Sequence, residues 1–209
     1  MASKTKPAEK EADGPEIRKR ILGAALSAFM EAGYAQTSTL EIATRARVSK
    51  RDLYTLFGNK EAMLVACISE RAQRLQVPID LPVLRDTKTL RGVLTAFGTK
   101  LLTETTDPMV VAVFRLAISE TVNAPKVAQT LESAARKPIR EALRTILANA
   151  ASAGLVAGDP EAMADTFLGL LWGDLMTGLM LQTTDRPSAV NIETRASKAT
   201  AGLIELHKA

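Results

Sequence analysis

The chain has 209 residues, 46% of them hydrophobic and 24% charged, an ordinary composition for a globular protein long enough to bury a core. A single cysteine, Cys67, excludes an internal disulfide and a multi-cysteine zinc site, and a single histidine, His207, makes a histidine triad or histidine-ligated metal a poor hypothesis. The formal net charge of +4 belongs to residues 16–77, with 10 Lys and Arg against 6 Asp and Glu, and a basic module in an otherwise neutral chain suits nucleic-acid binding.

The first predicted elements are a tail and a long helix. Residues 1–15 are rich in Lys, Glu, Ala and Pro and show no apolar period, so we expect a disordered tail without a signal peptide. Between Ile17 and Ala32, apolar residues recur at steps of three and four. This spacing predicts a helix over about 16–33 that ends at Gly33.

Two capping boxes mark the next two helices, each with a serine followed three residues later by an acid. The boxes are Ser38 with Glu41 and Ser49 with Asp52. They predict helices over about 39–46 and 49–57, joined by a turn of two or three residues. A further helix is predicted over about 60–76, capped by Asn59 and ended before Pro78.

Five more helices are predicted in the rest of the chain. Some begin at a proline in the first helical position, as at Pro108 and Pro160. Pro138 lies inside another and is expected to kink it near Lys137. The expected ranges are about 86–105, 108–121, 125–153, 160–182 and 188–207. The fold class is therefore all-α, with about nine helices.

The short helical pair within residues 37–61 fits a helix-turn-helix, whose second helix enters the major groove of DNA. Four basic residues lie close together there with no acid among them: Arg45, Arg47, Lys50 and Arg51. Lys50 and Arg51 fall in the first turn of the second helix, where such side chains donate hydrogen bonds to guanine. Tyr54 offers a hydroxyl to phosphate, and Lys60 adds a cation at a helix start. The alternative is a helical pair with a solvated basic edge.

Over about residues 16–75 the sequence resembles the N-terminal domain of TetR-type transcriptional regulators. The resemblance rests on Gly33-Tyr34-Ala35-Gln36-Thr37-Ser38, Ile42-Ala43, Val48-Ser49-Lys50-Arg51-Asp52-Leu53-Tyr54 and Phe57-Gly58-Asn59-Lys60-Glu61-Ala62-Met63-Leu64. It implies phosphate contacts from Thr37 or Ser38, Lys50, Tyr54 and Lys60. It also implies that the turn at Lys50 and Arg51 approaches the bases.

Two residues depart from the pattern of that family. Arg47 stands where these proteins often have glycine, and Leu56 stands where a His or Tyr that helps to hold phosphate is common. The expected DNA contacts are Thr37, Ser38, Arg45, Arg47, Ser49, Lys50, Arg51, Tyr54 and Lys60.

Residues 158–181 resemble the C-terminal regulatory domain of an AefR-like subset of the family. Residues 162–181 are nearly apolar enough for a membrane span, but Asp165 and Asp174 would be costly in a bilayer. We expect burial instead, and the resemblance implies a homodimer interface built from the helices over 160–182 and 188–207. Burial in the core of a monomer and a membrane span are the alternatives.

The same resemblance implies an effector pocket among the body helices. Ligand pockets are mostly apolar with a few polar groups, and most apolar residues of a helical body belong to its core. The expected ligand-binding residues are Phe97, Leu101, Val113, Phe114, Phe167, Trp172 and Met176. The candidate polar groups are Arg115, Glu120, Asp174 and Thr177.

We therefore expect a cytoplasmic homodimeric repressor that binds a palindromic DNA operator through helix 49–57 and is released by an apolar small-molecule effector. The expected domains are a disordered tail (1–15), a helix-turn-helix DNA-binding domain (16–60) and a ligand-binding and dimerisation domain (61–209). No cofactor, metal or membrane association is expected. The alternatives are a helical small-molecule carrier or scaffold without DNA binding, and an all-helical enzyme, for which no catalytic signature is present.

Overall fold

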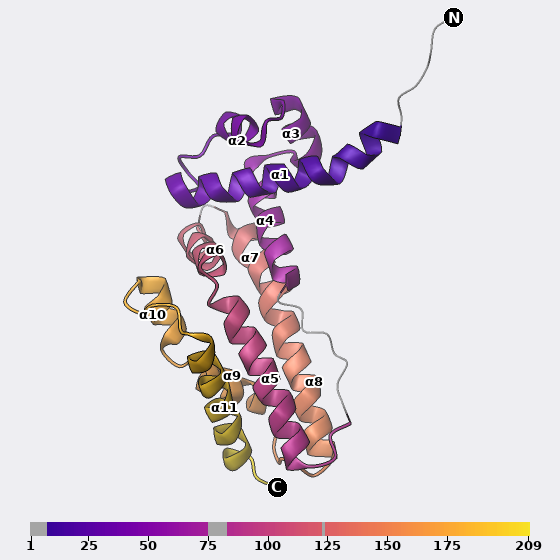
Figure 1. Ribbon diagram of the computed structural model, residues 1–209, viewed down its shortest axis with the longest axis vertical. Helices are drawn as coiled ribbons and strands as arrows, with labels where there is room; N and C mark the ends of the chain where they lie inside the picture. Colours follow the sequence, from indigo (N-terminus) through magenta and orange to yellow (C-terminus); the bar gives the residue numbers. More distant parts are fainter. Residues whose placement is uncertain (1–7, 75–82, 123) are drawn as a thin grey trace, which may run out of the picture. The chain divides into compact units, whose positions relative to one another are not determined.

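The computed structural model describes residues 8–74, 83–122 and 124–209 (Figure 1). These residues form eleven α-helices and one short π-helical segment and contain no strand, which confirms the expected all-α fold. They divide into two compact units. The head comprises the described residues up to Glu70 together with residues 116–130, and the body comprises those of 71–115 and 131–209. The head therefore includes residues beyond the expected domain limit at residue 60.

Four helices open the chain: α1 (Ala8–Ala32), α2 (Thr39–Ala46), α3 (Lys50–Phe57) and α4 (Lys60–Arg74). Within the head, α1 packs against α2 and α2 packs against α3 (Figure 1). Their apolar faces meet in a core that includes Ile21, Phe29, Ile42 and Leu53, each of them at most 1% exposed. The apolar residues whose spacing predicts these helices are thus the residues that form this core.

Helix α1 begins earlier than expected. Residues 8–15, which the sequence analysis assigned to a disordered tail, are helical, and Pro15 lies inside the helix. Ala, Lys and Glu all have high helix propensity, so this segment extends α1 without needing an apolar stripe of its own. The rest of the predicted tail lies outside the described residues.

The predicted helix starts in the head are confirmed. Ser38 Oγ accepts a hydrogen bond from the backbone N–H of Glu41 at 3.1 Å, and Asn59 Oδ1 accepts one from the N–H of Ala62 at 2.7 Å. At Ser49 both halves of the capping box are formed. These side chains satisfy backbone donors that have no partner inside the helix.

The later helices follow the predicted ranges closely, and the helix predicted over 125–153 is interrupted before Lys137 by a π-helical segment. They are α5 (Thr87–Thr105), α6 (Pro108–Ser119), α7 (Pro125–Leu131), α8 (Lys137–Ser152), α9 (Pro160–Trp172), α10 (Leu175–Leu181) and α11 (Ala189–Leu206). The π-helical segment η1 (Glu132–Arg136) separates α7 from α8, directly before Pro138. Because proline cannot donate a backbone hydrogen bond, the helical ladder is interrupted there.

The expectation of one continuous helix over 160–182 is wrong. The segment breaks after Trp172, because Gly173 adopts φ 44, ψ −126, which lies outside the helical region. Arg195 of α11 occupies the break, and its guanidinium donates to the carbonyl oxygens of Leu171 and Trp172 at 2.5 and 2.6 Å. A side chain from another helix thus supplies the donors that the next turn of a continuous helix would have supplied.

The body core lies where α5, α9 and α11 pack together and α8 covers α9. Phe97 of α5 and Phe167 of α9 meet edge to face, with ring centroids 6.4 Å apart. Phe167 is fully buried, and Leu101 is only 1% exposed. Among the described residues, no helix has both the length and the apolar character that crossing a bilayer requires.

Truncation of the central aromatic of the body is the first test. We expect Phe167→Ala to lower the free energy of unfolding by about 3–5 kcal/mol, because it leaves a cavity among α5, α9 and α11. Glu161→Ala, at an exposed position of the same helix, is the control and should change it by less than about 0.5 kcal/mol. Urea unfolding followed by circular dichroism measures both, and equal effects would contradict the packing described.

Candidate nucleic-acid interface

The turn between α2 and α3 consists of Arg47, Val48 and Ser49, as the spacing predicts. Arg47 adopts the left-handed conformation, with φ 55 and ψ 49. In this conformation the N–H of Arg47 donates to Thr44 O at 3.2 Å and that of Val48 donates to Ala43 O at 3.0 Å, which closes the end of α2. A side chain in the left-handed region costs roughly 1–2 kcal/mol relative to glycine. The structure thus accommodates a cationic side chain at the left-handed position of the turn.

The start of α3 is fixed by a reciprocal cap. Ser49 Oγ accepts from the backbone N–H of Asp52 at 3.1 Å, and the Asp52 carboxylate accepts from the backbone N–H and the hydroxyl of Ser49 at 3.2 and 2.6 Å. Leu53 and Phe57 face the head core. This anchoring leaves Lys50 and Arg51 exposed in the first turn of the helix.

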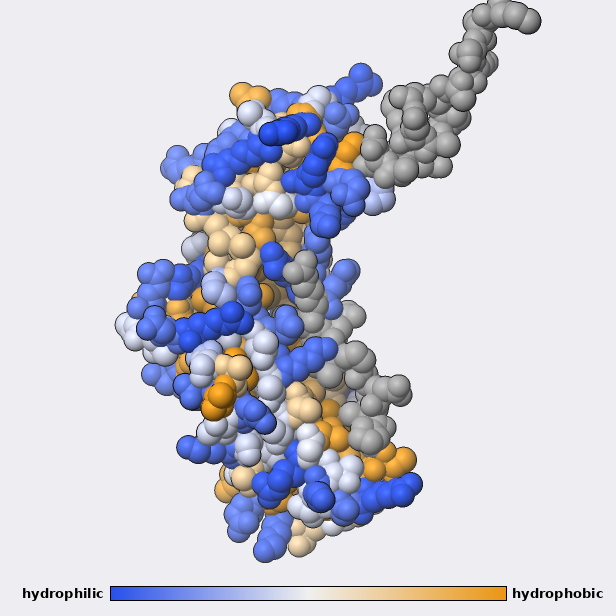
Figure 2. Space-filling view, viewed as in Figure 1, coloured by the Kyte–Doolittle hydropathy of each residue, from blue (hydrophilic) through white to orange (hydrophobic). Residues whose placement is uncertain are grey.

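The head surface in Figure 2 mixes hydrophilic residues with apolar ones, and Leu40 of α2 and Leu56 of α3 are 58% and 37% exposed. Arg47, Lys50 and Arg51 are exposed and form no ion pair with any residue of the described ranges. Three unpaired cations within five residues of the turn and the first turn of α3 create a local positive potential. Such a surface attracts a polyanion, and its guanidinium and ammonium groups are free to donate to phosphates or base edges.

Arg45 is engaged differently from its neighbours. Its Nη1 lies 2.8 Å from Glu31 Oε2 of α1, and its Nη2 lies 2.7 Å from Glu41 Oε1 one turn back in α2. Hydrogen bonds from Ser27 and from Arg45 hold the pKa of Glu31 below its usual value, and the bond to Glu31 raises the pKa of Arg45. Arg45 therefore ties α2 to α1, although its side chain remains partly exposed.

The structure separates the two residues proposed as alternatives at the start of α2. Thr37 is 2% exposed, and its hydroxyl donates to the carbonyl oxygens of Ala28 and Gly33 at 3.0 and 2.8 Å. Ser38 is exposed and caps α2. Of these two side chains, only that of Ser38 reaches the surface.

Lys60 is turned into the loop between α1 and α2. Its Nζ lies 2.7 Å from Tyr34 O, 3.0 Å from Thr37 O and 3.4 Å from Ala35 O, and 4.4 Å from the centroid of the Tyr34 ring. An ammonium group has three donors, and these carbonyl groups account for all of them. Burial, followed by the nearby charges of Glu61 and Glu120, raises the pKa of Tyr34. In this conformation no N–H of Lys60 is left for the phosphate contact that the sequence predicts.

One residue of this surface, Thr39, was not predicted from the sequence as a site residue. The hydroxyl oxygens of Thr39 and Tyr54 lie 3.1 Å apart, which joins the start of α2 to the middle of α3. Tyr54 is 45% exposed. Thr39 directly follows the helix cap Ser38, so its hydroxyl could have been noted from the sequence. Its contact with a tyrosine 15 residues later depends on the fold.

The structure places most expected ligand-binding residues in the body core. Four are buried: Phe97, Leu101, Val113 and Phe167. Phe114, Trp172 and Met176 are half-buried, and the indole N–H of Trp172 is enclosed without a hydrogen-bond partner. The surface of the body has a cavity between α5 and α11 and another beside α10, and neither of these is lined by any of the seven.

Comparison with protein families gives two matches. A family model described as "AefR-like transcriptional repressor, C-terminal domain" matches residues 92–204. A second, described as "Bacterial regulatory proteins, tetR family", matches residues 21–67. The first match alone covers more than half of the chain, and the second covers the helix-turn-helix.

Known relatives and structures agree with these matches. The uncharacterized HTH-type transcriptional regulator YvkB of Bacillus subtilis is 39% identical over 54 residues, which are 26% of this chain and 29% of that protein. Among solved structures, a putative TetR-family regulator from Mesorhizobium loti has a TM-score of 0.78 at 23% identity, covering 93% of this chain and 98% of its own. The flavonoid-responsive regulator FrrA has a TM-score of 0.74 at 26% identity, covering 92% and 97%.

The conformation of Arg47 generates a stability prediction. Arg47→Gly should raise the free energy of unfolding by about 1 kcal/mol, because glycine adopts the left-handed region without steric cost. Arg51→Gly, inside α3, should lower it by about 1 kcal/mol. Chemical denaturation of the two variants measures both effects, and a destabilised Arg47→Gly variant would contradict the turn geometry.

Proposed function

The chain belongs to the TetR family of bacterial regulatory proteins, and on this premise we propose a homodimeric repressor that a small molecule releases from a palindromic operator. Members of this family are DNA-binding regulators of transcription and are not enzymes. This protein is therefore a DNA-binding transcriptional regulator rather than an enzyme. The proposal places it in the cytoplasm, together with its DNA. No observation favours a carrier or scaffold that does not bind DNA.

The observation that carries the proposal is the set of exposed, unpaired cations at the start of α3. Lys50 and Arg51 occupy the first turn and Arg47 precedes them. In our proposal α3 enters the major groove, Lys50 and Arg51 approach base edges and phosphates, and Arg47 adds a phosphate contact. Ser38 and Tyr54 offer hydroxyl groups to the same backbone. Ser49 donates its hydroxyl to Asp52 and acts as a cap in this proposal.

Arg45, Thr37 and Lys60 take a second role in this proposal. Their polar groups are engaged inside the head, where Arg45 binds acids of α1 and α2 and the other two bind backbone carbonyl groups. We assign them to positioning of the helix-turn-helix. Loss of one of them would displace α2 relative to α1 and so weaken DNA binding indirectly.

Dimerisation is proposed through the segments 160–182 and 188–207, which contain α9, α10 and α11. Support comes from exposed apolar side chains: Leu170 of α9 is 41% exposed, and Val190 and Leu206 of α11 are 71% and 67% exposed. Apolar side chains on neighbouring helices favour association with a second copy. Two-fold symmetry would then require half-sites with centres about 34–36 Å apart, or a multiple of that distance.

We propose release by a small molecule because of the similarity to FrrA and because of the half-buried apolar side chains in the body. FrrA, similar to this chain over almost its whole length, is described as flavonoid-responsive. The half-buried Phe114, Trp172 and Met176 are the expected ligand-binding residues that combine an apolar side chain with some exposure. We propose that an apolar effector binds there and that effector and operator weaken each other's binding by about 1–3 kcal/mol.

Selection of bound sequences from a random DNA pool tests the proposal, repeated with candidate effectors. We expect a palindrome, and loss of the selected sequences when an effector is added. Sedimentation at micromolar concentration should give a dimer. A monomer, or a selected site without two-fold symmetry, would contradict the proposed assembly.

Two lysines provide a matched prediction. Lys50→Met should flatten the dependence of log Kobs on log salt by about one unit, because one phosphate contact is lost. It should leave the free energy of unfolding within about 0.5 kcal/mol, since Lys50 is exposed and unpaired. Lys60→Met should leave the salt slope unchanged and lower the free energy of unfolding by about 1–3 kcal/mol, because loop carbonyl groups lose a charged donor.

Titration of labelled operator at several salt concentrations, with urea unfolding of the same samples, measures both quantities. A flattened salt slope for Lys60→Met with unchanged stability would reverse the assignment and place Lys60 on the phosphates.

A further inference from the structure

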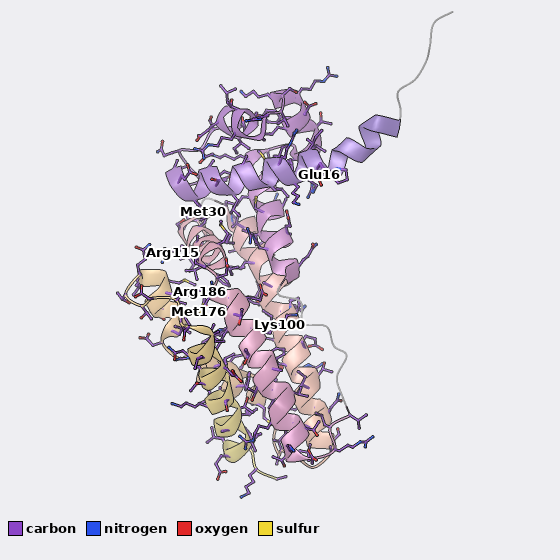
Figure 3. The ribbon with its side chains drawn as sticks, in the orientation of Figure 1. Glu16, Met30, Lys100, Arg115, Met176 and Arg186 are labelled. Atoms are coloured by element: carbon purple, nitrogen blue, oxygen red, sulfur yellow. The ribbon has the colours of Figure 1, made fainter. Side chains whose placement is uncertain are left out.

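The body contains a small cavity that the proposed function does not use. Its volume is about 220 Å³, and it lies between the junction of α5 and α6 on one side and the end of α10 with the turn that follows on the other. Its lining includes the buried apolar side chains of Val111 and Leu179 and two arginines, Arg115 and Arg186. Figure 3 shows the two arginines on the same side of the body as Met176 of α10.

Arg115 has a donor without an acceptor. Its Nη2 donates to Leu179 O, whereas its Nε is enclosed and has no hydrogen-bond partner. A guanidinium group stays charged at every physiological pH, so burial of an unpaired N–H carries a desolvation cost. Buried polar groups rarely remain unpaired in native proteins. An anion that enters the cavity and lets this side chain reorient would remove the deficit.

Arg186 brings a second guanidinium group to the same cavity. Its Nη2 donates to Thr103 O of α5 at 3.3 Å, which uses one of five N–H donors. Neither arginine forms an ion pair with a residue of the described part of the chain. Asp185 lines the cavity as well, so the two cations exceed the acids by one charge. The lining is therefore suited to a monoanion.

The wall of the cavity is held by backbone hydrogen bonds. Gln182 ends α10 in the left-handed conformation, with φ 59, and the N–H groups of Thr183 and Thr184 both donate to Gly178 O, at 2.9 and 3.3 Å. The turn approaches α10 so closely that a Cβ atom on Gly178 would lie 2.9 Å from Thr184 Cβ. The turn that carries Arg186 is therefore preorganised, which lowers the entropic cost of binding a ligand.

From these contacts we propose that the cavity binds the carboxylate of a small organic acid. Guanidinium groups bind planar carboxylates in a bidentate manner, and Val111 and Leu179 provide an apolar floor for the rest of the molecule. The inference is independent of the proposed repressor function, because it concerns binding to the body alone. Another cavity, between α5 and α11, is lined by Lys88, Arg91 and Lys100 against Glu193, but it is wide open to solvent, and none of the described residues that line it has an enclosed donor that lacks a partner.

Isothermal titration calorimetry of the full-length chain without DNA tests the proposal. The two probes are benzoate and benzamide, which have nearly the same shape and differ in charge, and ionic strength is held constant with chloride. We expect saturable binding of benzoate in the millimolar range or tighter and at least about tenfold weaker binding of benzamide. Inorganic phosphate, which cannot use the apolar floor, should bind more weakly than benzoate.

Variants assign the binding to the two arginines. Arg186→Gln, at an exposed position, should weaken benzoate binding about tenfold, and Arg115→Gln should do the same. Arg136→Gln is the matched control, because Arg136 is exposed in the body and pairs with Glu132 at 2.9 Å; it should leave benzoate binding unchanged. If Arg115→Gln does not fold, Arg186→Gln decides alone.

Three results would overturn the inference. They are the absence of saturable benzoate binding, equal affinity for benzoate and benzamide, and benzoate binding that Arg186→Gln does not weaken. Phosphate binding as tight as that of benzoate would overturn the assignment to an organic acid.

Discussion

The architecture depends on one constraint, that backbone groups left unpaired at helix ends must find partners. The constraint is strongest for short helices. In a helix of eight residues, the four N–H groups at one end and the four C=O groups at the other are a large share of all its backbone groups. In the head, Ser38, Ser49 and Asn59 supply acceptors to three successive helix starts, and Lys60 supplies donors to the loop carbonyl groups. In the body, Arg195 does the same at the break after α9. At these positions polar side chains determine where a helix begins or breaks.

This constraint distinguishes two groups among the basic residues around the helix-turn-helix. Arg45 and Lys60 are bound to acids or carbonyl groups, and they hold α1, α2 and the intervening loop together. Arg47, Lys50 and Arg51 have no such partners among the described residues and stay exposed. Fewer cations are therefore free to bind a polyanion than a count of residues suggests. They include the three of the turn and the first turn of α3, and Arg18, Lys19 and Arg20 of α1 are exposed as well.

Much of the fold could be predicted because its signals are local. A serine followed by an acid three residues later, a proline at a first helical position and an apolar period each involve only a few neighbouring residues. The prediction of one continuous helix over 160–182 failed because of an interaction between distant residues. Arg195 lies 23 residues after Trp172, and no local pattern says that it will stabilise a break there. The burial of Thr37 and the contacts of Lys60 likewise depend on how α1, its loop and α4 come together.

The aromatic residues are distributed between the two units in a way that makes each unit separately observable. The chain has two tyrosines and one tryptophan. Both tyrosines, Tyr34 and Tyr54, belong to the head, and Trp172 belongs to the body, with an enclosed indole N–H at the break after α9. Indole emission therefore reports on the body alone, and phenol absorbance reports on the head. An unlabelled sample contains intrinsic optical probes that distinguish a head that unfolds first from a chain that unfolds as one cooperative unit.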